Sequence, residues 1–376
     1  TPIETVNFMV GGVQGISPAI IRIVTAGILA GTLTESGAAT KIAEVIVKKL
    51  GDRNALLSMT LATCVLTAVG VFGDVAIITV APIGIQIAKK LKYRKLGILI
   101  AMIGGVKAGN VISPNPNAIA AADSFHQPLT SIMMVGLPCS LVAIIVTTFI
   151  AKLLSNKGTT IENMHIDMEN KDLPTFIGAI TGPAVTVLLL ILRPTLGIVI
   201  DPLIALPIGG ICGILAMKKG KNTLEFLTMG LQKMSGVSLL LVGTGALSGI
   251  IANSTLKDVI VEGIRILGLP PYLLAPVAGT LMGAATASST AGTTLGSQIF
   301  GPTILEYGLA PLAVAGMIHA GSFVFDGLPH GSFFHISAGS INMEISERLK
   351  LIVWESLIGI GMVTTSTILF GVLNII

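Results

Sequence analysis

Residues 96–122 read LGILIAMIGGVKAGNVISPNPNAIAAA, and this stretch decides the fold. The run Ser113-Pro114-Asn115-Pro116-Asn117 interrupts apolar sequence on both sides, and a proline inside a helix removes a hydrogen bond and clashes with the preceding turn. An ordinary loop is one interpretation, but the apolar flanks favour a helix broken inside a membrane. Such a break is tolerated only where protein or a water-filled cavity meets the freed backbone groups. The stretch therefore predicts a broken membrane helix beside a cavity.

The composition of the whole chain agrees with a lipid environment. Of its 376 residues 52% are hydrophobic and only 11% are charged, against roughly 25% in soluble domains. At about 20 residues per crossing, the length allows on the order of ten crossings. The net charge of +4 is small, and no basic patch suggests a nucleic acid. The three cysteines are scattered through apolar runs, which is typical of neither a disulfide framework nor a metal site. The prediction is an all-α polytopic membrane protein.

The two halves of the chain share an order of elements, which indicates an internal repeat. Gly27–Gly31 aligns with Gly245–Gly249, and Pro114 aligns with Pro329. Each half then has a short amphipathic helix (38–50 and 254–267), a long apolar stretch and a helix broken at proline. We therefore predict the following segments: 1–25, the remnant of an N-terminal helical region; 26–123, inverted repeat 1; 124–243, connecting spans with a polar loop at 155–172; 244–341, inverted repeat 2; and 342–376, a C-terminal helix.

Basic residues predict that the repeats are inverted. Lys and Arg flank the apolar stretch 54–88 on both sides, whereas the flanks of the stretch 271–305 hold neither. Because Lys and Arg stay on the cytoplasmic side, both ends of the first stretch are expected inside and both ends of the second outside. Each stretch is then a re-entrant hairpin, and the two hairpins enter from opposite faces, as in many secondary transporters.

Four interruptions in these segments are expected to meet near mid-membrane: 70–74, 109–117, 283–294 and 326–332. Helix N-termini at such breaks carry partial positive charge, which suits a carboxylate. Ser, Thr and Asn side chains both donate and accept hydrogen bonds, which suits hydroxyl groups. The pattern favours a small polyhydroxylated anion as the ligand.

The residues expected to contact this ligand come from all four interruptions. Packing between helices is the alternative role for any single Ser or Thr, but the cluster at the second hairpin tip favours binding. The candidates are Gly73, Asn115, Asn117, Ser288, Ser289, Thr290, His330 and Ser332.

Charged residues inside membrane segments are costly and usually functional. Asp74 is the only charge in its apolar stretch, and Asp326 lies in the second broken helix. Both are predicted to carry protons for coupling, with Lys107 as their electrostatic partner. Two roles remain open for Lys107: it holds the substrate carboxylate, or it neutralises Asp74. His330 is a further candidate for proton coupling, because histidine titrates near neutral pH.

The sequence does not favour a metal site, a hydrolase or a protein driven by ATP. His319, Asp326, His330 and His335 do not form the ladder of two histidines at i, i+4 on one helix face that is typical of metal sites, so no metal and no cofactor are expected. An intramembrane hydrolase is the remote enzyme alternative, but no Gly-x-Ser-x-Gly elbow accompanies these residues. No catalytic residue is therefore assigned, and without a Gly-rich phosphate loop direct drive by ATP is not expected.

Three motifs resemble the gluconate permease family, and the resemblance covers essentially the whole chain: 112–123 (ISPNPNAIAAAD), 285–292 (ATASSTAG) and 319–332 (HAGSFVFDGLPHGS). It implies a proton-coupled symporter of sugar acids in a bacterial inner membrane, within the ion transporter superfamily. It further implies a homodimer and an elevator-like alternating-access mechanism. The family usually begins with additional helices, so the chain is expected to be N-terminally incomplete. A sodium-coupled carboxylate transporter is the main alternative.

Overall fold

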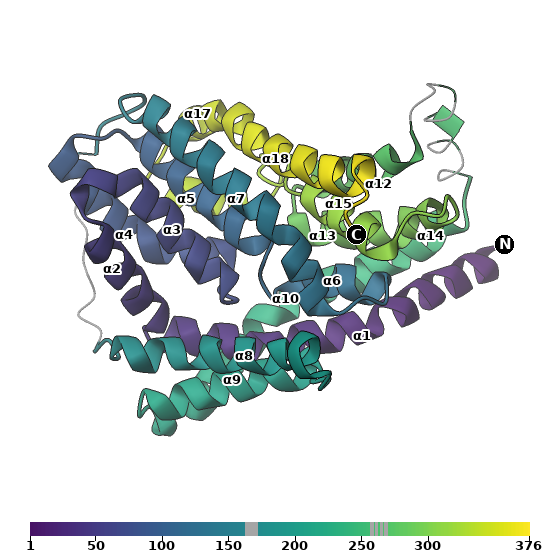
Figure 1. Ribbon diagram of the computed structural model, residues 1–376, viewed down its shortest axis with the longest axis horizontal. Helices are drawn as coiled ribbons and strands as arrows, with labels where there is room; N and C mark the ends of the chain where they lie inside the picture. The colour runs from purple at the N-terminus through teal and green to yellow at the C-terminus, as the bar shows by residue number, and fades with distance from the viewer. Residues whose placement is uncertain (162–171, 256–258, 260–261, 264–265, 267–269) are drawn as a thin grey trace.

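The computed structural model describes residues 1–161, 172–255, 259, 262–263, 266 and 270–376, and all regular structure in these ranges is helical (Figure 1). The expected all-α membrane architecture is confirmed in this coarse form. Among the described residues, five helices are long and apolar enough to cross a membrane: Pro2–Glu35, Leu129–Leu154, Phe176–Leu196, Gly220–Ala252 and Ile345–Val372.

The first half contains a helical hairpin followed by a broken helix. Its helices are α1 (Pro2–Glu35), α2 (Ala38–Leu50), α3 (Ala55–Ala68), α4 (Gly73–Leu91), α5 (Lys95–Asn110) and α6 (Pro116–Ser124). The hairpin turns between α3 and α4, and the predicted break separates α5 from α6. The amphipathic segment 38–50 forms α2 with the predicted bounds.

The second half follows the same order. Its helices are α12 (Leu274–Thr286), α13 (Ser289–Leu295), the π-helical segment Gly296–Phe300, α14 (Gly301–Leu305), α15 (Pro311–Gly321) and α16 (Ser332–Ser340). The hairpin turns between α12 and α13, and the chain is broken between α15 and α16. Most of the predicted amphipathic segment 254–267 lies outside the described residues, as do residues 162–171 of the polar loop.

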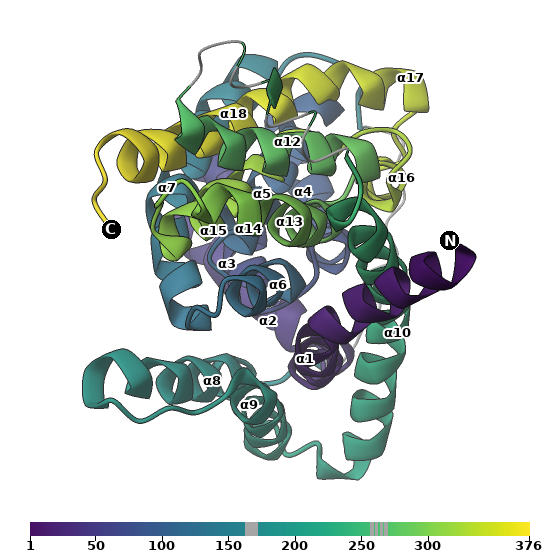
Figure 2. The same cartoon turned by 90° about the vertical axis from the view of Figure 1, so that its right-hand side faces the viewer.

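The remaining helices connect and flank these two units. They are α7 (Leu129–Leu154), α8 (Phe176–Leu196), α9 (Pro202–Ala216), α10 (Thr223–Ala252), α17 (Ile345–Arg348) and α18 (Ile352–Ser366). Helices α8 and α9 lie against α1 on one side of the molecule, and α18 runs along the opposite side (Figures 1 and 2). Large apolar side chains such as Phe149, Ile177 and Leu188 are exposed on α7 and α8, which suits helices that face lipid.

Glycines allow the helices to approach closely, as is common in membrane proteins. Helix α5 packs on α3 at Gly105, where an added Cβ would lie 2.2 Å from the carbonyl oxygen of Thr60. Helix α15 packs on α12 in the same way, because a Cβ on Gly279 would lie 2.1 Å from the carbonyl oxygen of Ile318. In both halves, therefore, the first helix of the hairpin supports the first part of the broken helix.

In each half, the hairpin tip packs against the broken helix of the other half. The tip helix α13 of the second hairpin packs on α6 of the first broken helix, and α4 of the first hairpin packs on α16 of the second. Helices α1 and α10 run antiparallel, since Gly12 lies against Gly245 while Gly31 lies against Gly230. The predicted segment boundaries at 25/26 and 243/244 fall inside these two continuous helices. Inversion of the complete repeats stays a prediction.

Candidate functional site

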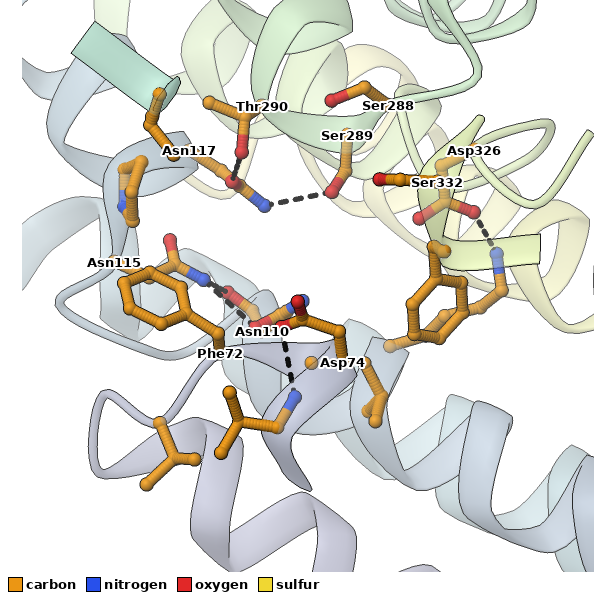
Figure 3. A pocket seen from close by; sticks show the side chains of 18 of the residues that line it. Phe72, Asp74, Asn110, Asn115, Asn117, Ser288, Ser289, Thr290, Asp326 and Ser332 are labelled. Carbon is orange, nitrogen blue, oxygen red and sulfur yellow. Dashed lines mark hydrogen bonds and ion pairs between the residues drawn. The ribbon is translucent and has the colours of Figure 1, made fainter. Parts of the chain in front are cut away.

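Four helices begin at one open cavity of about 330 Å³, which is lined by residues of both hairpin tips, both helix breaks and α10. Figure 3 shows the polar side chains of this lining. The four helices are α4, α6, α13 and α16, and the residues at their first turns line the cavity: Phe72, Gly73, Asn115, Pro116, Ser288, Ser289 and Ser332. The volume lies at the lower end of the range for small-molecule sites, roughly 300–1,000 Å³.

Local sequence explains why the helices begin here. Asn115 accepts a hydrogen bond from the backbone N–H of Ala118 (3.2 Å), and Pro116 follows it at the first helical position, where proline is tolerated. Ser288 caps α13 in the same way by accepting from Ala291 (3.3 Å), after Ala287 has reversed the chain with a φ of +45°. The predicted breaks at 113–117 and 283–294 therefore mark helix starts.

The convergence of helix starts brings partial positive charge to the cavity. The first N–H groups of a helix have no partner within that helix, and the helix dipole adds partial positive charge. An anion entering the cavity would meet such groups from four directions, which is how proteins commonly bind carboxylates and phosphates.

One amide links the two halves across the cavity wall. The Nδ2 group of Asn117 donates to Ser289 Oγ (3.1 Å), and its Oδ1 atom accepts a hydrogen bond from the Thr290 hydroxyl (Figure 3). The Asn115 side chain is fixed by the end of α5, because its Nδ2 group donates to the carbonyl oxygen of Asn110 (3.0 Å). Hydroxyl and amide groups thus form a fixed polar surface beside the helix starts.

Lys107 and Asp326 form a buried ion pair that also joins the halves. Lys107 is 1% exposed and Asp326 8%, and the lysine donates in addition to the carbonyl oxygen of Phe323 (2.7 Å). The alternative in which Lys107 neutralises Asp74 is corrected here: the carboxylate beside the lysine comes from the second broken helix. The sequence left both carboxylates open as partners of Lys107, and the packing of α5 against the α15–α16 connection selects Asp326.

Asp74 lies in the first turn of α4 and is half-buried. Its carboxylate accepts a hydrogen bond from the backbone N–H of Val75 (2.9 Å). Within the described part of the chain it has no basic partner at ion-pair distance. Its carboxylate therefore lies at the cavity beside the N-terminus of α4.

All the predicted site residues except His330 line this cavity: Gly73, Asp74, Lys107, Asn115, Asn117, Ser288, Ser289, Thr290, Asp326 and Ser332. The structure does not place His330 in the cavity wall. This residue is exposed, and its ring Nε2 lies 3.1 Å from the carbonyl oxygen of Ala284. Whether the residues in the wall bind substrate or carry protons stays a prediction.

Sequence reasoning missed several residues of the wall. Lys233 enters from α10 and pairs with Glu35 of α1 at 2.9 Å, and Asn110, Phe72 and Phe333 are also among the residues that line the cavity. Lys233 is the only basic residue in α10, so the argument applied to Lys107, that a charge inside an apolar span is functional, would have found it. The aromatic residues give no comparable signal, since their sequence context is like that of core residues.

Apolar spans, interrupted helices and a polar cavity between them define a polytopic membrane transporter. A family model described as GntP family permease matches residues 2–376, and the chain belongs to this family. It is accordingly a permease rather than an enzyme.

Individual relatives agree with this membership. The chain is 55% identical to an uncharacterized transporter of Haemophilus influenzae (98% of this chain, 88% of the relative) and 23% identical to the inner membrane permease YgbN of Escherichia coli (92% and 84%). It is 24% identical to the gluconate permease of Bacillus subtilis over 35% of this chain and 30% of that protein.

The fold also resembles a solved transporter structure. The YdaH transporter of Alcanivorax borkumensis superposes with a TM-score of 0.70 at 15% identity, over 97% of this chain and 86% of that one. The chain is therefore a multi-pass protein of the bacterial inner membrane.

Proposed function

We propose that this permease takes up gluconate or a related sugar acid together with protons, by alternating access. The observation that carries the proposal is the convergence of four helix starts on one cavity whose wall also bears hydroxyl, amide and lysine groups. A carboxylate suits the helix N-termini, and a chain of hydroxyl groups suits Asn117, Ser289 and Thr290. The likeness to a gluconate permease supports this substrate class.

The charges of the wall support proton coupling. Lys107 pairs with Asp326 and Lys233 with Glu35, so each lysine is already neutralised before substrate arrives. A carboxylate substrate adds one negative charge to a site that already contains Asp74, and a buried excess charge is expensive. Protonation of Asp326 removes its charge and frees the Lys107 ammonium group for the substrate carboxylate. Binding of the anion and of the proton then favour each other.

Alternating access is proposed to move the cavity past α10. Lys233, Met234 and Val237 of α10 line one side of the cavity, and the two hairpin tips and helix breaks line the rest. A unit formed by the hairpins and broken helices, sliding against α1 and α10, would expose the cavity first on one side of the membrane and then on the other. This is the elevator-like movement that the resemblance implies.

A homodimer is proposed with this mechanism, because a sliding unit needs a stationary partner in the bilayer. Ile177 of α8 and Leu215 of α9 belong to an exposed apolar surface that lipid or a second copy would cover. The mass of the purified protein in detergent, measured by light scattering, is expected to correspond to two chains. A mass of one chain would remove the dimer from the proposal without affecting the site.

Transport assays in proteoliposomes test the function. Labelled gluconate and a panel of related sugar acids are offered under an inward proton gradient without sodium, and separately under an inward sodium gradient without a pH gradient. We expect accumulation with the proton gradient alone. Accumulation that requires sodium would establish the alternative, a sodium-coupled carboxylate transporter in which break carbonyls and Asn side chains hold the ion. Failure of every sugar acid under both gradients would reject the substrate class.

A further inference from the structure

A second buried ion pair lies directly behind the cavity. Arg348 of α17 and Glu355 of α18 are 0% and 1% exposed, and the guanidinium group donates to both carboxylate oxygens, at 2.9 and 3.0 Å. Arg348 Nε also donates to Ser337 Oγ (3.0 Å), and the guanidinium group lies over the ring of Phe334 at 4.6 Å. Neither charged residue lines the cavity. Two desolvated charges are costly inside a membrane protein and usually indicate a function.

The Glu355 carboxylate touches the loop that carries Asp326. A Cβ built on Gly327 would lie 2.5 Å from Glu355 Oε2 and 2.8 Å from Oε1, so the carboxylate occupies the space where that side chain would be. Gly327 follows Asp326 directly. The pairs Lys107–Asp326 and Arg348–Glu355 therefore both contact one short stretch of backbone, from Phe323 to Gly327.

We propose that Arg348 and Glu355 are positioning residues for Asp326: they fix the loop of the second helix break, and their charges balance the field in which Asp326 gains and loses its proton. The inference rests on the proposed role of Asp326 in proton coupling. Arg348 contacts α16 and Glu355 contacts Gly327, so both support the loop from α17 and α18, while Lys107 of α5 pairs with Asp326 in the same loop. Without the support from Arg348 and Glu355, the Asp326 carboxyl group would not stay aligned with the Lys107 ammonium group when Asp326 loses its proton.

If Arg348 and Glu355 act through their charges, removing one charge or the other shifts the protonation of Asp326 in opposite directions, which a purely structural role would not predict. A nearby negative charge favours protonation of a carboxyl group, and a nearby positive charge opposes it. Loss of the Glu355 charge would leave Arg348 unpaired and make Asp326 harder to protonate, whereas loss of the Arg348 charge would do the opposite. The titratable and charged groups nearest to Asp326 on the packed elements are Lys107 from α5, Asp74 from α4 and Lys233 from α10, which line the same cavity, and Arg348 from α17 and Glu355 from α18, which lie against its loop. His319 of α15 contacts Phe323, at the start of this loop.

Infrared pH titration of the purified protein tests the inference without requiring transport. The signal is the protonated carboxyl band that disappears in Asp326→Asn. Relative to the wild-type protein, we expect its midpoint to shift by about one pH unit toward acid in Glu355→Gln and about one unit toward alkaline in Arg348→Met. The double variant Arg348→Met/Glu355→Leu removes both charges but keeps side chains of similar size against the loop, so its midpoint is expected to return to within a few tenths of a unit of wild type. Equal midpoints, or single shifts in the same direction, would overturn the inference.

Glu347 provides a matched control on the same helix. It is also buried, but its carboxylate accepts from the backbone N–H and the hydroxyl group of Thr159, both at 2.7 Å, so Glu347→Gln is expected to leave the midpoint unchanged. If the single charge variants do not fold, Glu355→Asp keeps the charge but withdraws the carboxylate from Gly327. A displaced midpoint in Glu355→Asp supports positioning, and a wild-type midpoint rejects it.

The outcome is separable from that of the proposed function. A wild-type protein that fails to accumulate labelled gluconate, but whose charge variants shift the Asp326 band as expected, would reject the substrate while the positioning role stands. Gluconate uptake by the wild-type protein with no shift in any variant would reject the positioning role alone.

Discussion

Asn117 is the residue whose chemistry connects the two halves most directly, because its single amide contacts Ser289 and Thr290. Removing the amide in Asn117→Ala takes away one donor and one acceptor at the proposed hydroxyl-binding surface. We expect KM for the sugar acid to rise about tenfold, since a net loss of about 1.4 kcal/mol is typical of one or two such bonds. Initial uptake rates at varied substrate concentration measure this effect. The exposed Asn222, whose amide donates to Glu225 away from the cavity, is the control, and an unchanged KM in Asn117→Ala would remove this residue from the site.

The Lys107–Asp326 pair predicts different outcomes for single and double substitutions. Lys107→Met leaves a buried carboxylate without its partner, which typically costs about 3–5 kcal/mol, so thermal unfolding in detergent is expected at a clearly lower temperature. The double variant Lys107→Met/Asp326→Leu removes both charges and is expected to recover most of this stability but no gradient-driven accumulation. A double variant that still accumulated substrate would show that the pair is structural only.

Asp74 is predicted to act in coupling rather than in binding. Its carboxylate faces the cavity without an ion-pair partner among the described residues, so Asp74→Asn preserves shape and changes only the ability to release a proton. Exchange of internal for external substrate is expected to survive better than uptake driven by a proton gradient. Comparison of the two assays on the same proteoliposomes decides this, and equal loss of both would assign Asp74 to folding or binding.

For individual residues, the sequence predicts which residues line the cavity more reliably than which side chains pair with one another. Polar residues at interruptions of apolar sequence identified most of the cavity wall, because a break inside a membrane needs a polar surrounding. The partner of Lys107 was not predictable, since Asp74 and Asp326 are equally plausible until the packing of α5 is known. His330 failed to reach the cavity because side-chain direction in an irregular segment depends on local turns that composition does not specify.

Among the elements, the contact between α3 and α5 provides a sharp test of the packing. A Cβ on Gly105 would lie 2.1 Å from Thr63 Oγ1 and 2.2 Å from a backbone carbonyl, whereas a Cβ on Gly243 in α10 would meet nothing within 4 Å. Gly105→Ala is therefore expected to destabilise the protein by about 1–3 kcal/mol, because the backbone must move apart. Gly243→Ala is the matched control with the same chemical change. Equal melting temperatures for the two variants would contradict the packing described here.

Sequence predicted the types of element well and their boundaries less well. The hydrophobic period fixes α2, and the breaks at Pro114 and Pro329 follow from backbone chemistry. The repeat limits at 25/26 and 243/244 lie inside α1 and α10, so they do not coincide with helix ends, and as limits of repeat units they stay predictions. Hydropathy likewise does not reveal that α13 continues through a π-helical segment into α14.

Across the whole molecule, each hairpin tip packs on the broken helix of the other half, so residues of both halves are needed to form the cavity. Helix α13 packs on α6, and α4 packs on α16, which brings helix starts from both halves to the same place. This arrangement depends on contacts between residues more than 150 positions apart, such as Asn117 with Ser289, and a single sequence does not specify such contacts. The sequence signals that pointed to it were the shared order of elements, the four polar interruptions and the basic flanks of the first apolar stretch.

Protection of a cysteine at Ser289 by substrate shows whether the sugar acid binds among these helix starts. Cys64 and Cys139 are buried, so replacing Cys212 by alanine gives a suitable background, with Asn222→Cys as an exposed control. In Ser289→Cys, a small water-soluble thiol reagent is expected to label the protein in the absence of substrate. Gluconate is expected to slow this labelling, with a half-maximal effect near its KM. The control Asn222→Cys is expected to be labelled at the same rate with and without gluconate. Labelling of Ser289→Cys at one rate with and without gluconate, in a protein that still transports it, would contradict the account.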